Sequence, residues 1–312
     1  MARHGSSFAN SFGLLKQTFS EWLEDKAPQL GAALAYYTVF SLAPLVLVLL
    51  AIVGLIFRND PGGAWNKITE QMSYFLDKSA VEVVQNIAQK AAQPNKSLLA
   101  TIIGILLALF GASGVFGQLQ DALNTIWGVK AKPGLGIWRF LRTRFSSFAM
   151  VAGVCFLLLV SLAIEALLKG FSHYIQGALP GGLVIAVSVY LIFDFAVSTT
   201  LFAMIFKILP DVKTRWNDVW IGAVMTAIFF LIGKWALGLY LGSGTAASAY
   251  GAASSLITLL LWIYYSSQIL LFGAEFTQVY ASEFGSPIKP DRYAVKVERK
   301  EAELPPASRA KD

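Results

Sequence analysis

The feature that most constrains this chain is a set of six long apolar stretches with few or no charged residues. They cover residues 31–57, 97–119, 145–168, 182–206, 216–241 and 250–280. A helix needs about 20 mostly apolar residues to cross the hydrocarbon core of a membrane. Because 56% of the residues are hydrophobic and 14% are charged, a soluble fold of this length could not bury the apolar surplus. The sequence therefore predicts an all-α, polytopic membrane protein with six transmembrane helices.

Positively charged residues predict the orientation of these helices, because Lys and Arg gather in the cytoplasmic loops of membrane proteins. The connection between the second and third stretches is strongly basic; it carries Lys130, Lys132, Arg139, Arg142 and Arg144 without an acidic residue. The fourth connection and the C-terminal segment are also basic. With six spans, these segments share one side with the N-terminus. Both termini are therefore expected in the cytoplasm, and the net charge of +6 reflects topology rather than affinity for nucleic acid.

Three segments outside the apolar stretches have patterns of their own. Residues 8–25 place aromatic and leucine side chains at helical spacing, which is typical of an amphipathic helix in the membrane interface or packed under the bundle. Residues 58–96 form the longest connection and predict one or two amphipathic helices on the outer face. Residues 286–312 are charged and contain proline, which is typical of disorder. We therefore expect a single membrane domain at 1–285 and a disordered cytoplasmic tail at 286–312.

The rarity of cysteine and histidine excludes several kinds of site. Cys155 is the single cysteine and lies in an apolar run, so no disulfide forms within the chain. His4 and His173 are far apart, and neither has a ligand partner at helical spacing. Zinc and haem sites need such ligands. The sequence therefore predicts no metal site, no cofactor and no catalytic residues.

Ionisable side chains within the apolar stretches are the first candidates for function, because a charge is expensive to keep in lipid. Glu165, Asp194 and Lys234 are such residues. Asp194 and Lys234 are predicted at depths that differ by roughly 8 Å, given a rise of about 1.5 Å per residue, and a lysine side chain covers much of that distance. Three interpretations stay open. Lys234 pairs with Asp194 or Glu165 to hold helices together, these groups form a path for a solute or proton, or the side chains face lipid and extend toward the membrane interface.

A second set of polar side chains comes from the first, second and sixth stretches, at similar depth and toward the cytoplasm. Its members are Tyr36, Tyr37, Ser41, Gln118, Asp121, Asn124, Tyr264, Gln268 and Glu275. A water-accessible cavity that faces the cytoplasm needs such a lining, because unpaired polar groups are costly in lipid. Hydrogen bonds between helices would use the same residue types. Both interpretations stay open here.

Several short motifs resemble those of one known family. They are LAYYTVFSLAP at 34–44, FGASGVF at 110–116, LNTIWG at 123–128, LPD at 209–211 and LFGAE at 271–275. Together they resemble the YihY/virulence factor BrkB family of membrane proteins, over about residues 10–285. The resemblance implies a bacterial inner-membrane, multi-pass protein with six spans, which agrees with the count of apolar stretches.

The resemblance implies less about chemistry, since some family members carry an old label as a tRNA-processing ribonuclease and others are discussed as transporters of lipids or lipid precursors. Cleavage of a phosphodiester with a metal needs clustered carboxylates or histidines, and cleavage without one needs a general acid and base. The cytoplasmic acids Asp121, Asp211 and Asp218 are scattered in the sequence, with no histidine near them. A ribonuclease is therefore the least supported of the functions.

The residues and the resemblance together predict a protein that is not an enzyme. We expect a transporter or transport-assisting protein that moves an amphiphile, such as a lipid or lipid precursor, through a polar cavity facing the cytoplasm. The alternative is a structural or partner-binding membrane protein, whose polar residues only join helices. Membrane lipids are the expected partners, and association with a second copy or with other envelope proteins stays open.

Overall fold

The computed structural model is mostly helical. It describes residues 7–56, 62–63, 65–66, 68–70, 78–91, 114–132, 182–242, 254–285 and 288–297. Its named helices are α1 (Ser7–Glu24), α2 (Ala27–Ile56), α4 (Lys78–Ala91), α7 (Gly182–Ile208), α8 (Trp216–Gly242) and α10 (Ser254–Glu283). Residues 114–126 are helical as well.

Three of the predicted apolar stretches coincide with helices that are long and apolar enough to cross a membrane. These segments are Leu191–Ile208 of α7, Trp216–Tyr240 of α8 and Leu256–Glu283 of α10. The first predicted stretch coincides with α2, a continuous helix of 30 residues. Residues 97–113 of the second stretch and the whole third stretch, 145–168, lie outside the described residues. The number of six spans therefore stays a prediction.

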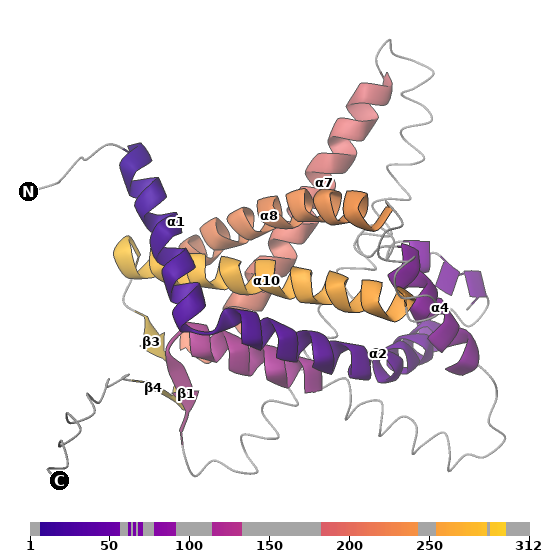
Figure 1. Cartoon of the computed structure of the whole chain (residues 1–312), viewed down its shortest axis with the longest axis horizontal. Coiled ribbons are helices and arrows are strands. Elements are labelled where there is room, and N and C mark those ends of the chain that lie inside the picture. The colour runs from indigo at the N-terminus through magenta and orange to yellow at the C-terminus, as the bar shows by residue number, and fades with distance from the viewer. Residues whose placement is uncertain are drawn as a thin grey trace, which may run out of the picture.

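The centre of the fold is α10, which packs against α8 on one side and α2 on the other, while α7 packs against α8 (Figure 1). Small residues allow α8 and α10 to approach closely. A Cβ atom added at Gly222 of α8 would collide with Thr277 of α10, and one added at Gly273 of α10 would collide with Thr226 of α8. Each helix therefore places a glycine against a threonine of the other helix. Such close contacts at small residues are typical of membrane helices.

The hydroxyl groups at this contact are satisfied within their own helices. Thr226 donates a hydrogen bond to the Gly222 carbonyl oxygen, and Thr277 donates one to the Gly273 carbonyl oxygen, both at 2.6 Å. Ser267 makes the same contact with the carbonyl oxygen four residues before it, at 2.7 Å. Hydroxyl side chains can therefore be buried between apolar helices without leaving a donor unpaired.

The first helix, α1, packs one face against α10 and leaves the other face open. Thr18 is fully buried, and the Trp22 ring meets the Phe272 ring edge-on with centroids 6.5 Å apart. Phe12 and Phe19 are 74% and 54% exposed on the other face. The predicted amphipathic helix at 8–25 coincides with α1. It packs on the bundle and still presents an aromatic face.

Part of the long connection at 58–96 is helical, as predicted. Its helix α4 lies at the end of the bundle opposite the strands (Figure 1). Val84 of α4 is fully buried in a small apolar cluster with Leu42 and Val46 of α2 and Leu259 of α10. The amphipathic face of α4 therefore rests on the middle of α2 and the first turns of α10.

The C-terminal segment corrects one prediction. Its strands β3 (Lys289–Pro290) and β4 (Ala294–Lys296) pair with β2 (Val212–Lys213) and β1 (Val129–Ala131), both antiparallel. The prediction of a disordered tail from residue 286 is therefore wrong for residues 288–297. This short segment joins two connections that are far apart in the sequence, and its strands are an addition to the predicted all-α fold.

Candidate functional site

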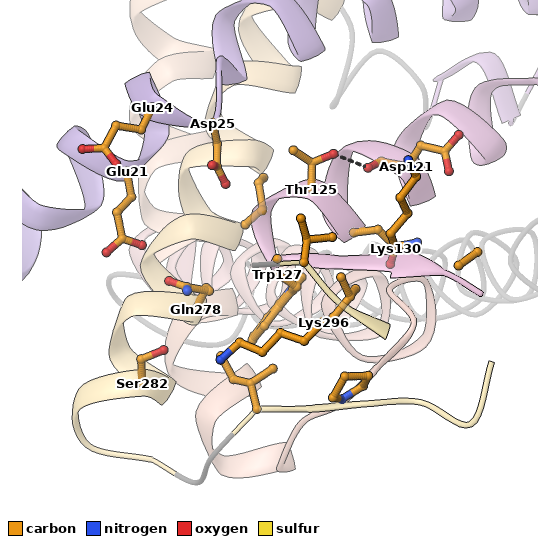
Figure 2. A pocket seen from close by; sticks show the side chains of 18 residues that line it. Glu21, Glu24, Asp25, Asp121, Thr125, Trp127, Lys130, Gln278, Ser282 and Lys296 are labelled. Atoms are coloured by element: carbon orange, nitrogen blue, oxygen red, sulfur yellow. Dashed lines mark hydrogen bonds between the residues drawn. The ribbon is translucent and has the colours of Figure 1, made fainter. Parts of the chain in front are cut away.

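A pocket of about 910 Å³ lies where the paired strands meet the ends of α1 and α10 (Figure 2). Its wall is formed by the last part of α1, the stretch 121–131, the last turns of α10 and the C-terminal segment. The charged side chains of the lining are Glu21, Glu24, Asp25, Asp121, Lys130 and Lys296. The pocket therefore combines acidic and basic groups, with acidic groups in excess.

One side of the pocket is acidic because of the way α1 ends. Glu21 and Glu24 lie in its last turn and Asp25 follows directly. The side-chain amide of Gln17 donates a hydrogen bond of 2.9 Å to Glu21. Carboxylates at a helix C-terminus add to the negative end of the helix dipole, which costs about 0.3–1 kcal/mol each. The chain then turns sharply at Lys26, whose φ of 56° is in the left-handed region.

The other side of the pocket is formed by the β1–β4 ladder, which supplies both lysines. In its register Val129 is opposite Lys296, and Lys130 is opposite Val295. Since partners in a ladder share a face and neighbours along a strand do not, the two lysines are on opposite faces. The Lys296 side chain reaches toward the part of the pocket where Gln278 and Ser282 lie (Figure 2).

Two polar atoms beside these charges are buried without a partner. The indole N–H of Trp127, a residue that is only 3% exposed, has no acceptor among the described residues. The side-chain oxygen of Gln278 likewise has no donor there. Both residues line the pocket. Such groups cost about 1–3 kcal/mol each when they stay unpaired, so the pocket has an unused donor and an unused acceptor in its wall.

A buried pair of side chains fixes the position of this wall. The Asn124 amide donates a hydrogen bond of 3.0 Å to the Asp211 carboxylate, and the Asp211 backbone N–H donates one of 2.8 Å to the Asn124 side-chain oxygen. The Asp211 carbonyl oxygen accepts a further bond of 2.8 Å from the Asp291 backbone N–H. The helix at 114–126, the connection at 209–213 and the C-terminal segment are thereby held together.

The structure brings only part of the predicted cavity lining to this pocket. Of the nine predicted residues, Asp121 and Asn124 line it, and the amide group of Asn124 is used in the contact with Asp211. Ser41 is buried. A Cβ atom added at Gly114 would lie 3.8 Å from the Ser41 hydroxyl oxygen and 3.8 Å from the Tyr37 ring, which is ordinary van der Waals contact. These contacts belong to the packing of α2 on the helix at 114–126.

The other predicted residues are spread over the bundle. Tyr36 is 58% exposed, and the centroid of its ring lies 4.6 Å from the centroid of the Phe40 ring. The Gln268 amide lies against Gly31, at 3.5 Å from the Pro28 carbonyl oxygen. Glu275 is fully buried in α10, Tyr264 is partly exposed, and Gln118 is half-buried on the helix at 114–126. Of the nine residues, Asp121 and Asn124 are the two that line the pocket of about 910 Å³.

The intramembrane charges are partly placed. The Lys234 ammonium nitrogen of α8 lies 4.0 Å from a carboxylate oxygen of Asp194 on α7. The two side chains are 27% and 11% exposed. Of the three predicted interpretations, this geometry supports the ion pair of Lys234 with Asp194. Glu165 lies outside the described residues.

Residues missed by sequence reasoning form most of the charged pocket. The sequence pattern marks the acids at 21–25 only as part of an amphipathic helix, and it marks Lys130 and the basic C-terminal segment, which includes Lys296, only as indicators of topology. One usable signal was present: Glu21, Glu24 and Asp25 are acidic on a side of the membrane otherwise predicted to be basic. In the described residues, no group of three or more His, Cys, Asp or Glu side chains could hold a metal ion.

The apolar helices define the class of this chain as a mostly helical membrane protein. The chain belongs to the family described as virulence factor BrkB, whose sequence profile matches residues 18–297. This confirms the predicted resemblance. No solved structure matches the chain.

Curated relatives carry the name UPF0761 membrane protein. One from Tolumonas auensis is 27% identical over 258 residues, which are 81% of this chain and 80% of the relative. One from Pseudomonas aeruginosa strain LESB58 is 28% identical over 260 residues, 81% of this chain and 59% of the relative. One from Stenotrophomonas maltophilia strain K279a is 26% identical over 285 residues, 90% of this chain and 63% of the relative. This chain therefore spans only part of the length of the latter two relatives.

Proposed function

We propose that this protein is a bacterial inner-membrane transporter or transport-assisting protein whose cargo is an amphiphile, such as a lipid or lipid precursor. The observation that carries the proposal is the charged pocket of about 910 Å³ at the ends of α1 and α10. An amphiphile needs a polar site for its head beside an apolar surface for its chains. A small ion needs neither the volume nor the apolar surface.

The apolar surface is present next to the pocket. On α1, Phe12, Phe19 and Leu23 are 74%, 54% and 51% exposed, while the acids at the end of the same helix line the pocket. An aromatic helix face of this kind binds at the boundary between head groups and acyl chains. A lipid held there could place its head in the pocket while its chains stay among apolar groups.

The topology we propose has six spans, with both termini and the pocket on the cytoplasmic side. The strand pairing supports it, because the second connection, the fourth connection and the C-terminal segment are joined at one end of the bundle. Single cysteines introduced in a Cys155→Ser background test it. An impermeant thiol reagent added outside intact spheroplasts should label Gln89→Cys on α4 and should not label Lys213→Cys. Labelling of both from the same side would contradict the topology.

A lipid-translocation assay tests the transport function. The full chain would be reconstituted into vesicles with a fluorescent phospholipid analogue, and an impermeant quencher would report the lipids that reach the outer leaflet. We expect faster exchange than in protein-free vesicles, slower exchange for Lys296→Met, and no change for Lys289→Met. Lys289 is exposed on β3 and does not line the pocket. Exchange no faster than in empty vesicles for every lipid class would contradict transport by the chain alone.

The alternative is a structural or partner-binding membrane protein that transports nothing. The use of the Asn124 and Gln268 amides in contacts within the fold favours it. This alternative predicts no lipid exchange, together with a loss of assembly when the exposed face of α1 is changed. An enzymatic role, including RNA cleavage, is not part of either proposal, and incubation of the purified protein with tRNA should leave the RNA intact.

A further inference from the structure

We infer that the pocket binds a zwitterion that carries a primary ammonium and a phosphate diester, which is the head-group chemistry of an aminophospholipid. The inference deepens the proposed function and rests on it for the lipid as the source of this head group. It depends on three observations: carboxylates at the end of α1, the ammonium group of Lys296 that reaches toward Gln278, and one buried donor and one buried acceptor that have no partner among the described residues.

The acidic side provides the place for the ammonium. Glu21, Glu24 and Asp25 gather at the C-terminal end of α1, where the helix dipole already disfavours negative charge. The carboxylates therefore gain from a cation. The side-chain oxygen of Gln278 is buried without a donor among the described residues, and it lies on the same side of the pocket as Glu21 (Figure 2). An ammonium offers three N–H donors to such acceptors.

The basic side provides the place for the phosphate. Lys296 comes from the β1–β4 ladder, and its side chain extends across the pocket wall (Figure 2). Trp127, which lies next to that ladder in the sequence and is 3% exposed, holds an indole N–H without an acceptor among the described residues. A phosphate oxygen accepts from both kinds of donor. The indole nitrogen has almost no exposed surface, so a phosphate oxygen would remove the penalty of this unpaired donor only after a small movement of the ring.

The balance of charges selects the zwitterion over other ligands. A divalent metal would need clustered ligands, and the described residues contain no such cluster. An anionic head group without an amine would meet the carboxylates of α1, and like charges repel. A cation without a phosphate would leave Lys296 and the Trp127 N–H unused. The volume of about 910 Å³ is at the upper end of small-molecule pockets, which are about 300–1,000 Å³, so the head group has room to enter.

Binding of matched head groups to the purified full chain tests the inference. Calorimetric titration would compare glycerophosphoethanolamine with glycerophosphoglycerol, and dihexanoyl phosphatidylethanolamine with dihexanoyl phosphatidylglycerol, each below its critical micelle concentration. Within each pair the phosphate diester is the same, and the head alcohol changes from ethanolamine, which carries the ammonium, to glycerol, which carries hydroxyl groups and no positive charge. We expect the ethanolamine compounds to bind at least about tenfold more tightly. If the dihexanoyl lipid binds more tightly than the chain-free compound, the source is a lipid; equal affinities would point to a free zwitterion.

Variants locate the site. Lys296→Met and the double variant Glu21→Gln with Glu24→Gln should each weaken ethanolamine binding by about tenfold, as the loss of a charge-assisted contact would. Trp127→Phe keeps the ring and removes the N–H, and should weaken binding by about threefold. Lys289→Met removes a positive charge from the same C-terminal segment outside the pocket and should bind as the unchanged protein does.

Two results would overturn the inference. One is equal affinity for the ethanolamine and glycerol compounds, and the other is the same affinity for Lys296→Met and Lys289→Met. Its failure is distinguishable from failure of the proposed function. Lipid exchange without a preference for the amine would leave transport standing and remove the zwitterion site. Tight, Lys296-dependent binding without lipid exchange would leave the site standing and remove transport.

Discussion

Asn124 and Asp211 form a reciprocal pair of hydrogen bonds, 3.0 and 2.8 Å long, across 87 residues of sequence. Both side chains are almost fully buried, at 5% and 9% exposed. Because the Asp211 backbone also contacts the C-terminal segment, this pair connects three parts of the chain at one end of the bundle. The wall of the pocket depends on it.

Asn124→Ala should therefore destabilise the protein. Loss of hydrogen bonds to a buried carboxylate costs about 1.5–3 kcal/mol, and Asn124→Asp should cost more because it places two carboxylates together. Thermal unfolding in detergent measures the effect. Thr125→Ala is the control, since the exposed Thr125 hydroxyl bonds only within its own helix turn. Equal melting temperatures for Asn124→Ala and Thr125→Ala would contradict the structural role of the pair.

The contact between α8 and α10 predicts that Gly273→Ala is harmful. The new methyl group would collide with Thr226, and overpacking of this kind costs about 1–3 kcal/mol. Adding Thr226→Gly should restore part of the loss, because it removes the atoms in the way. Gly238→Ala on α8 is the control, since nothing lies within 4 Å of the added atom. Melting temperatures that do not separate the two alanine variants would show that the helices are not packed this closely.

The ion pair of Asp194 with Lys234 predicts coupled effects on folding. Lys234→Met or Asp194→Asn alone leaves one charge in an apolar region, which lowers the folded yield. The double variant leaves no unpaired charge, and should recover stability by about 0.5–3 kcal/mol relative to the sum of the single changes. Size-exclusion profiles and melting curves measure this. A double variant that folds well and loses lipid exchange would show instead that the pair takes part in transport.

The turn between α1 and α2 predicts a stabilising substitution. Lys26 adopts a φ of 56°, a conformation that glycine reaches without strain and other residues rarely adopt. Lys26→Gly should raise the free energy of unfolding by about 0.5–1 kcal/mol. Lys16→Gly, in the middle of α1 and exposed, should lower it by about 1 kcal/mol, since glycine is a poor helix former. We expect the melting temperature to rise for Lys26→Gly and to fall for Lys16→Gly.

The helices could be predicted from the sequence because the membrane imposes a simple rule. An apolar stretch of sufficient length has to form a helix, since every backbone polar group needs a partner within the segment. The residues of α7, α8 and α10 satisfy that rule without reference to the rest of the chain. The face of α1 could be predicted for a similar reason, because its helical spacing is local.

The strands and the pocket could not be predicted in this way. β2 and β3 are two residues long and show no alternation, so their partners are set by the fold alone. Asn124 is predicted to line a cavity with residues of the first and sixth stretches, and its partner Asp211 comes from a distant connection. Gln268 was also expected in a cavity, and a glycine at position 31 gives it room to pack between helices instead. Sequence spacing gives the depth of a polar side chain in the bundle, and tertiary contacts decide what it meets.

The pairing of the C-terminal segment has a consequence for how the protein is made. The membrane helices are all synthesised before residues 288–297, and those residues supply β3 and β4 and part of the pocket wall. A chain that ended after α10 would contain every described helix and would still lack the part of the pocket wall that carries Lys296. The pocket wall can therefore be completed only after residues 288–297 have been synthesised, and a fusion partner on the C-terminal side has to be attached after this segment.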